Sequence, residues 1–160
     1  LGYTETTPGV AGSLDEALSK VEPVRRTQFA KLWWDTLGVC WFSTEGIKES
    51  IELTRRCLAQ AVGWEDFTMD EALEVGERVT NLMRLVYGRR GFKKSDEFDV
   101  SPRHLENTAI GTGSEKGIAP YLPEMVNDYY RQMGWNVETG LPTSETLRRL
   151  DMDEFLEDAG

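Results

Sequence analysis

The sequence predicts an all-α fold, an irregular multi-helix domain with a long loop at about residues 92–121. Three observations support this prediction. Apolar residues recur at helical spacing in several segments, capping residues and glycines mark the segment ends, and no alternating run reaches strand length. A chain of 160 residues is long enough for one domain with its own core, so residues 1–160 are expected to form a single domain.

The first two helices are predicted from their ends. "SLDE" begins with Ser13 and has the form of a capping box, so a helix is expected from there to about Val21. Pro23 suits the first turn of a second helix. That helix should end near Leu37, because Gly38 can adopt the left-handed conformation that often follows a helix.

The next two helices carry the clearest apolar periodicity. One is expected from about Glu45 to Ala61, with Ile47, Ile51, Leu58 and Val62 as its buried stripe and Gly63 after its end. "TMDE", from Thr68, is a second capping box and starts the longest helix, which should run to about Arg90 before Gly91. The expected apolar side of this helix comprises Leu73, Val75, Val79, Leu82, Met83, Val86 and Tyr87.

Two arginines interrupt the apolar pattern of that longest helix. Arg78 and Arg84 lie six residues apart, so they point to different helix faces, and structural ion pairs are their expected use.

The C-terminal third contains the long loop and two further helices. "LPEMVNDYYRQMG" predicts a helix with Pro123 in its first turn and Gly134 after its end. "PTSETLRRL" predicts a short helix capped by Thr143 or Ser144. The acidic end "DMDEFLEDAG" is expected to be a frayed, solvated tail.

Charge and composition exclude several function classes. The chain has 28 acidic and 18 basic residues, and its net charge of −10 disfavours nucleic acid and anionic membranes as partners. It lacks an apolar run of about 20 residues, so no membrane span is expected, and its first residues do not resemble a secretory signal. Two cysteines make no disulfide framework, so a reducing, cytoplasmic location is expected. With one histidine, neither a self-contained zinc site nor a Ser–His–Asp site is expected, and no catalytic residue is assigned.

The segment "DTLGVC" places an acid, a glycine and a thiol close together. Cys40 has the residue type of a small buried hydrophobe, but its thiolate could also bind a soft metal or an iron–sulfur cluster. Asp35 near a helix C-terminus opposes the helix dipole, so we expect it to have a partner, either the N–H donors of an amino-pyrimidine ring or an arginine. Gly38 could bring the backbone close to a ligand or simply end the helix.

Three other candidates carry weaker signals. Cys57 lies in the middle of a predicted helix and is interpreted as a core residue. His104 lies in the polar part of the long loop and is expected to fix that loop or to lie at the surface. "GTGSEKG", residues 111–117, looks like a phosphate-binding loop, but it follows no strand and opens no helix.

Five segments together resemble the C-terminal part of the tungsten-containing aldehyde:ferredoxin oxidoreductases. In chain order they are "DTLGVC", "GWEDFTMDEALEVGERVTNLMRLVYGRRGFKKSDEFD", "SPRHLE", "MVNDYYRQMGW" and "GLPTSETLRRLDM", and they cover most of residues 30–152. The first segment matches a DxxGLC-type motif of that family. The chain is therefore expected to be the C-terminal domain, a fragment, of a longer protein.

The resemblance implies roles for three residues. Asp35 would bind the ring nitrogens of a pterin that holds tungsten or molybdenum, and Val39 would contact the pterin through its main chain. Cys40 would be the fourth ligand of a 4Fe–4S cluster. Val39 stands where the family often has leucine, a change that a main-chain contact should tolerate.

The resemblance also implies what must lie elsewhere. The other three cluster cysteines and a second pterin-binding segment belong to the N-terminal domains of the family, which would be partners of this domain together with ferredoxin. The parent would oxidise an aldehyde to a carboxylic acid, and the isolated 160-residue chain would be inactive. Two alternatives remain open, the same domain of a benzoyl-CoA reductase-type tungsten subunit and a non-catalytic helical interaction domain.

Overall fold

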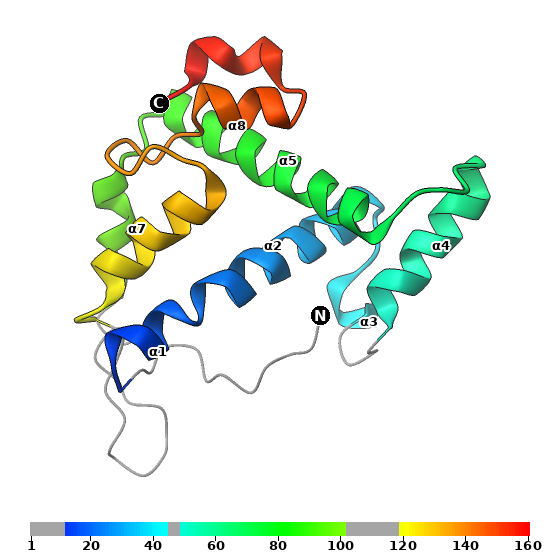
Figure 1. Cartoon of the computed structure of the whole chain (residues 1–160), viewed down its shortest axis with the longest axis horizontal. Helices are drawn as coiled ribbons and strands as arrows, with labels where there is room; N and C mark the ends of the chain where they lie inside the picture. Colours follow the sequence, from blue (N-terminus) through cyan, green and yellow to red (C-terminus); the bar gives the residue numbers. More distant parts are fainter. Residues whose placement is uncertain (1–11, 45–48, 102–118) are drawn as a thin grey trace. The chain divides into compact units, whose positions relative to one another are not determined.

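The computed structural model describes residues 12–44, 49–101 and 119–160 and confirms the all-α prediction (Figure 1). Within these residues the only β-type pairing is an isolated bridge between Trp135 and Pro142. The α-helices are α1 (Leu14–Leu18), α2 (Val21–Thr36), α3 (Trp41–Thr44), α4 (Ser50–Val62), α5 (Met69–Arg89), α7 (Leu122–Met133) and α8 (Ser144–Arg149). Two 3-10 helices, η1 (Lys94–Phe98) and η2 (Asp153–Asp158), follow α5 and α8. The predicted long loop therefore begins with a short helical turn.

The described chain divides into two compact units. The first comprises residues 26–83, and the second comprises residues 12–25 and 84–160. Helices α2 and α5 each contribute residues to both units (Figure 1). None of the described helices is long and apolar enough to cross a membrane.

The first unit is built around a close approach of α2 and α5. A Cβ atom added at Gly76 of α5 would lie 2.0 Å from the Phe29 carbonyl oxygen of α2, so only glycine fits this position. Trp33 of α2 packs on Phe67, with ring centroids 5.5 Å apart. Arg55 of α4 donates a hydrogen bond to the Phe67 carbonyl, which ties α4 to the loop before α5.

Three predicted helix ends are confirmed by their hydrogen bonds or backbone conformation, whereas α1 ends at Leu18 and not near Val21. Before α5, the Thr68 N–H donates to Glu71 Oε2 at 2.6 Å and the Glu71 N–H donates to Thr68 Oγ1 at 3.2 Å, which is a reciprocal capping box. The Thr68 hydroxyl also donates to Glu71 Oε2, at 2.8 Å. The bonds that the Glu71 carboxylate accepts from the Thr68 N–H and the Thr68 hydroxyl lower the pKa of the Glu71 carboxyl, the backbone bond being the larger cause. Thr143 caps α8 by accepting from the Thr146 N–H at 3.3 Å. Gly134 ends α7 with φ of 65°, in the left-handed region.

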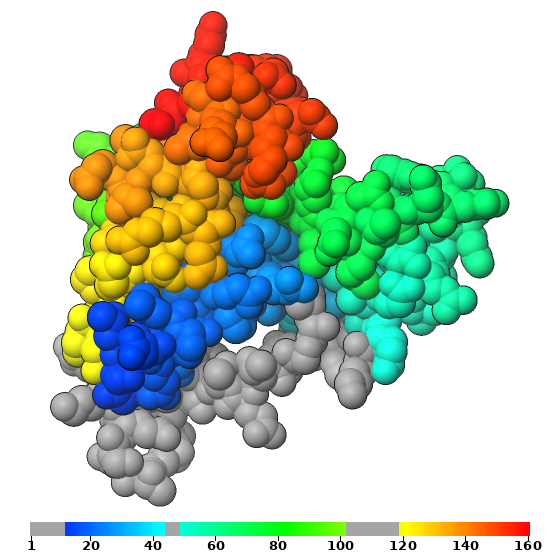
Figure 2. All heavy atoms as spheres, viewed as in Figure 1, coloured from blue at the N-terminus to red at the C-terminus, as the bar shows by residue number. Residues whose placement is uncertain are grey.

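The second unit has a small apolar core where α5 meets the C-terminal segment. Leu85, Leu147, Leu150 and Met152 are buried together there. Side chains from the last residues pack on this cluster, and they are Phe155, Leu156 and Ala159. Figure 2 shows α8 and η2, coloured orange to red, packed against each other. The expectation of a frayed acidic tail is wrong, because every third or fourth residue of "DMDEFLEDAG" is apolar and the segment forms a 3-10 helix on the core.

The longest helix, α5, buries a different side from the one that its apolar pattern indicates. Thr80 and Asn81 are 3% and 0% exposed, whereas Leu82 and Met83 are each 40% exposed. Thr80 and Asn81 fit the interior because their side chains donate to backbone carbonyls of the same helix, four residues back. The expected apolar side of α5 is therefore partly exposed in this chain.

Candidate functional site

The "DTLGVC" segment forms the end of helix α2 and the turn to α3. Gly38 has φ of +70°, its N–H donates to the Asp35 carbonyl at 3.1 Å, and the Val39 N–H donates to the Trp34 carbonyl at 3.0 Å. These two bonds are the paired bonds of a Schellman motif, in which a glycine ends the helix and two free carbonyls are satisfied. The prediction that Gly38 takes a left-handed conformation at the helix end is confirmed.

Asp35 lies in the last turn of α2 with a cationic partner one turn earlier. Lys31 Nζ donates to Asp35 Oδ2 at 2.5 Å, and the two side chains are 48% and 43% exposed. The partner expected for Asp35 is therefore a lysine of the same helix rather than an arginine. An exposed pair of this kind contributes little to stability, so the carboxylate can exchange its lysine for another donor at small cost.

Cys40 lies directly before α3 and has an exposed, free thiol. Its carbonyl accepts from the Ser43 hydroxyl at 2.6 Å and from the Ser43 N–H at 3.0 Å. Trp41 packs edge-on against Trp34, with ring centroids 5.4 Å apart, and Trp34 Nε1 donates to Thr54 Oγ1 of α4 at 3.3 Å. These contacts fix the backbone on both sides of the thiol. The interpretation of Cys40 as a small buried hydrophobe is wrong, because the turn directs it out of the core.

The second cysteine also differs from its prediction. Cys57 lies on α4 and is exposed, not part of the core. The buried side of α4 is formed by residues such as Ile51 and Ala59, which are 6% exposed. Cys57 is six residues after Ile51 and two before Ala59, and at 3.6 residues per turn these spacings place it on the opposite side of the helix. Two thiols are thus accessible in this chain, although only Cys40 belongs to the "DTLGVC" motif.

No group of three or more His, Cys, Asp or Glu side chains within residues 12–44, 49–101 and 119–160 could hold a metal ion. His104 and the "GTGSEKG" segment lie outside the described residues. Within the "DTLGVC" segment, the Cys40 thiol is a ligand for soft metals, whereas the Asp35 carboxylate is a hard oxygen ligand.

Comparison with known proteins decides the family. Residues 4–152 match the family described as aldehyde ferredoxin oxidoreductase, domains 2 and 3. The chain belongs to this family. The five sequence segments that carry the resemblance all fall within the matched range.

Curated members of the aldehyde ferredoxin oxidoreductase family support the assignment. The tungsten-containing aldehyde ferredoxin oxidoreductase of Pyrococcus abyssi is 34% identical over 122 residues, which are 76% of this chain and 19% of the relative. The enzymes of the same name from Pyrococcus horikoshii and Thermococcus kodakarensis are each 33% identical over 122 residues, with the same coverage. The chain thus spans about a fifth of the length of the curated relatives that it matches.

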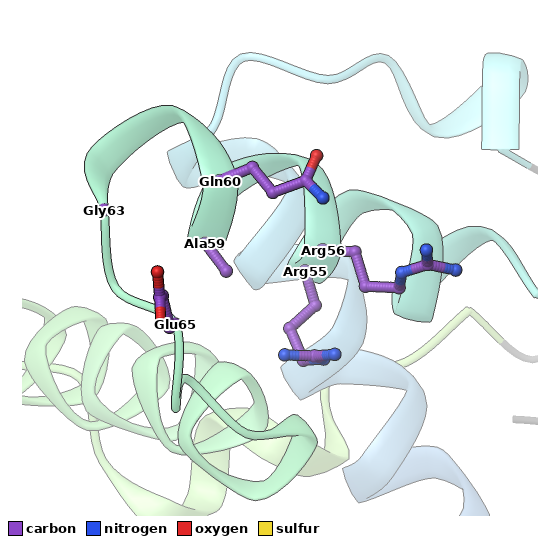
Figure 3. A pocket seen from close by; sticks show the side chains of 6 residues that line it. All are labelled: Arg55, Arg56, Ala59, Gln60, Gly63 and Glu65. Atoms are coloured by element: carbon purple, nitrogen blue, oxygen red, sulfur yellow. The ribbon is translucent and has the colours of Figure 1, made fainter.

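A pocket lies at the C-terminal end of α4, away from the "DTLGVC" segment in sequence. It has a volume of about 480 Å³. Figure 3 shows Arg55, Arg56 and Gln60 projecting from α4 and Glu65 from the following loop. Arg55 is held by both Glu52 carboxylate oxygens, at 2.8 and 2.7 Å, and by the Phe67 carbonyl. Its hydrogen bonds lower the pKa of the Glu52 carboxyl. Sequence reasoning did not find this pocket, since its residues carry no motif.

Proposed function

We propose that this chain is the C-terminal domain of a tungsten- or molybdenum-dependent aldehyde oxidoreductase. The parent protein would convert an aldehyde and water to a carboxylic acid and pass two electrons to ferredoxin in the cytoplasm. The observation that carries the proposal is the "DTLGVC" segment in a chain of this family. The curated relatives of the chain are named as tungsten-containing aldehyde ferredoxin oxidoreductases. The metal–pterin and the 4Fe–4S cluster supply the redox chemistry when bound.

The residues at the end of α2 fit the roles proposed for them. Asp35 would accept hydrogen bonds from the N–H groups of the pterin ring, because its carboxylate is 43% exposed and its lysine partner is exposed as well. Val39 would contact the pterin through its main chain, which the Schellman motif fixes. Cys40 would bind cluster iron through its free, exposed thiol. A Cβ atom built at Gly38 would find no atom within 4 Å, which leaves room beside the turn for a ligand.

The proposed site is one half of a cofactor site. A 4Fe–4S cluster takes about four thiolate ligands, and the chain has two cysteines in all. The remaining ligands would come from the N-terminal domains of the same polypeptide, so the cluster and pterin would lie where the domains meet. The isolated 160-residue chain should therefore bind neither tungsten nor a stable cluster, and it should not oxidise aldehydes.

Two measurements test the proposal. Elemental analysis of the purified 160-residue chain should find no stoichiometric iron or tungsten, and stoichiometric metal would contradict the half-site. In the full-length parent, Cys40→Ala should remove the iron of one cluster and its visible absorption. Cys57→Ala is the matched control, because it removes another exposed thiol, one outside the motif. Retention of the full iron content in the Cys40 variant would refute the assignment of Cys40.

A further inference from the structure

Helix α5 presents an apolar stripe on its outward side. Val75, Val79, Leu82 and Met83 follow one another at spacings of four, three and one residues, which places them on one face of a helix. All four belong to the first compact unit. Leu82 and Met83 are each 40% exposed, and the two valines are half-buried. We call these four residues the α5 stripe.

The opposite side of α5 is the one that packs within the unit. Gly76 lies against the backbone of Phe29, and Thr80 and Asn81 are almost fully buried. Amphipathic helices of globular proteins usually bury their apolar side and expose their polar side. In this segment of α5 the arrangement is reversed, because the small and polar residues face inward and the aliphatic residues face outward.

The reversed arrangement is explained if α5 has partners on both sides. A contiguous exposed apolar surface with a polar rim is typical of a protein contact. The rim here is an ion pair on the same helix, in which Arg78 Nη2 donates to Glu74 Oε1 at 2.7 Å. A partner with an apolar surface would therefore fit the α5 stripe better than a charged partner would.

We propose that the α5 stripe is an interdomain contact, covered in the parent protein by the part of the polypeptide outside this sequence. The matched part of the curated relatives is 19% of their length, so most of such a polypeptide is available to cover it. A tethered domain also binds at a high effective concentration, which favours it over a second copy of the chain. The inference rests on the proposed function only in that this chain is one domain of a longer protein, and it uses neither Asp35 nor Cys40.

Substitution of Leu82 tests the contact, because its effect on the Tm should differ between the 160-residue chain and the full-length parent. Leu82→Lys should leave the Tm of the 160-residue chain unchanged, because the side chain is exposed there. In the full-length parent the same substitution places a charge in the contact and should lower the Tm by about 2 °C. Leu82→Met, which keeps the volume and the hydrophobicity, is the matched control and should leave the Tm unchanged in both proteins. Equal effects of Leu82→Lys in the two proteins would overturn the proposal.

Oxidative footprinting of Met83 gives a second readout that does not depend on a variant. Met83 should be oxidised readily in the 160-residue chain and protected at least tenfold in the full-length parent, while Met152, which is 5% exposed, is protected in both. Equal oxidation of Met83 in both proteins would overturn the proposal. The proposal would also fail if the parent were a dimer that Leu82→Lys dissociates, because the stripe would then contact a second copy of the protein. The metal content of the parent tests the proposed function separately, so the interdomain contact and the proposed cofactor site can fail independently of each other.

Discussion

The Arg84 guanidinium donates a hydrogen bond of 2.6 Å to the Tyr130 hydroxyl and so joins α5 to α7 within the second unit. The same guanidinium donates to the Gly140 carbonyl at 2.6 Å and to Glu97 Oε1 at 2.9 Å. The Tyr130 hydroxyl donates in turn to Glu97 Oε1 at 2.9 Å. Arg84 also lies over three aromatic rings, with 4.6 Å from its Cζ to the centroid of Phe92 as the shortest separation. One buried cation therefore organises four segments of this unit.

Removal of this cation should destabilise the chain strongly. Arg84→Ala leaves the Gly140 carbonyl and the Tyr130 hydroxyl without their buried donor, so we expect a loss of about 3 kcal/mol in the free energy of unfolding. Arg78→Ala is the control on the same helix, since its ion pair with Glu74 is partly exposed, and it should change stability by less than about 1 kcal/mol. Urea unfolding monitored by circular dichroism measures both. Similar losses in the two variants would contradict a special role for Arg84.

Tyr130 should give the chain an alkaline limit of stability. Burial raises the pKa of Tyr130 above its ordinary value of 10.0, and its hydrogen bond to Glu97 raises the pKa further. Because the folded-state pKa is the higher one, this contribution to stability is present below pH about 10 and is lost as the pH rises further. Tm measured from pH about 8 to 11 should fall less steeply for Tyr130→Phe than for the unsubstituted chain. Tyr87→Phe, at an exposed tyrosine, should retain the original slope.

Gly76 should tolerate no side chain. Alanine has a helix propensity about 1 kcal/mol better than glycine, but its Cβ would lie 2.0 Å from the Phe29 carbonyl oxygen. Because that atom belongs to a helix backbone, α2 and α5 must separate, and we expect Gly76→Ala to lose about 2 kcal/mol or more. Gly38→Ala, where the Cβ meets no atom, should lose only the left-handed backbone term of about 1 kcal/mol. A stabilising effect of Gly76→Ala in thermal unfolding would show that the two helices do not touch there.

Both cysteines should react with a thiol reagent in the native chain. Cys40 and Cys57 are exposed and free, so a chromogenic disulfide reagent should titrate two thiols without denaturant. Cys57→Ser should leave one. If the remaining thiol of that variant reacted only after unfolding, Cys40 would be buried and could not reach a cluster. In the parent, cluster binding should protect Cys40 from the same reagent.

The candidate site was predictable in part from adjacent residues. The Schellman motif at Gly38 could be predicted because a helix end and its glycine lie within five residues, and their hydrogen bonds stay in the main chain. The exposure of the Cys40 thiol could not, since it depends on the direction in which Trp41 and Trp34 hold the turn. The Lys31 partner of Asp35 lies at i−4 on a helix and could have been found from helical spacing.

By itself, the sequence determined the longer helices and several of their ends, among them the capping box at Thr68, the cap at Thr143 and the glycine stop at Gly134. These features depend on hydrogen bonds among residues that are neighbours in the chain, so local chemistry decides them. Only the tertiary structure decided which side of a helix is buried, as at Gly76 against Phe29 and at Leu82 on the outward side. Burial depends on which distant segment packs there. In α5 a backbone approach that only glycine allows outweighed the apolar pattern.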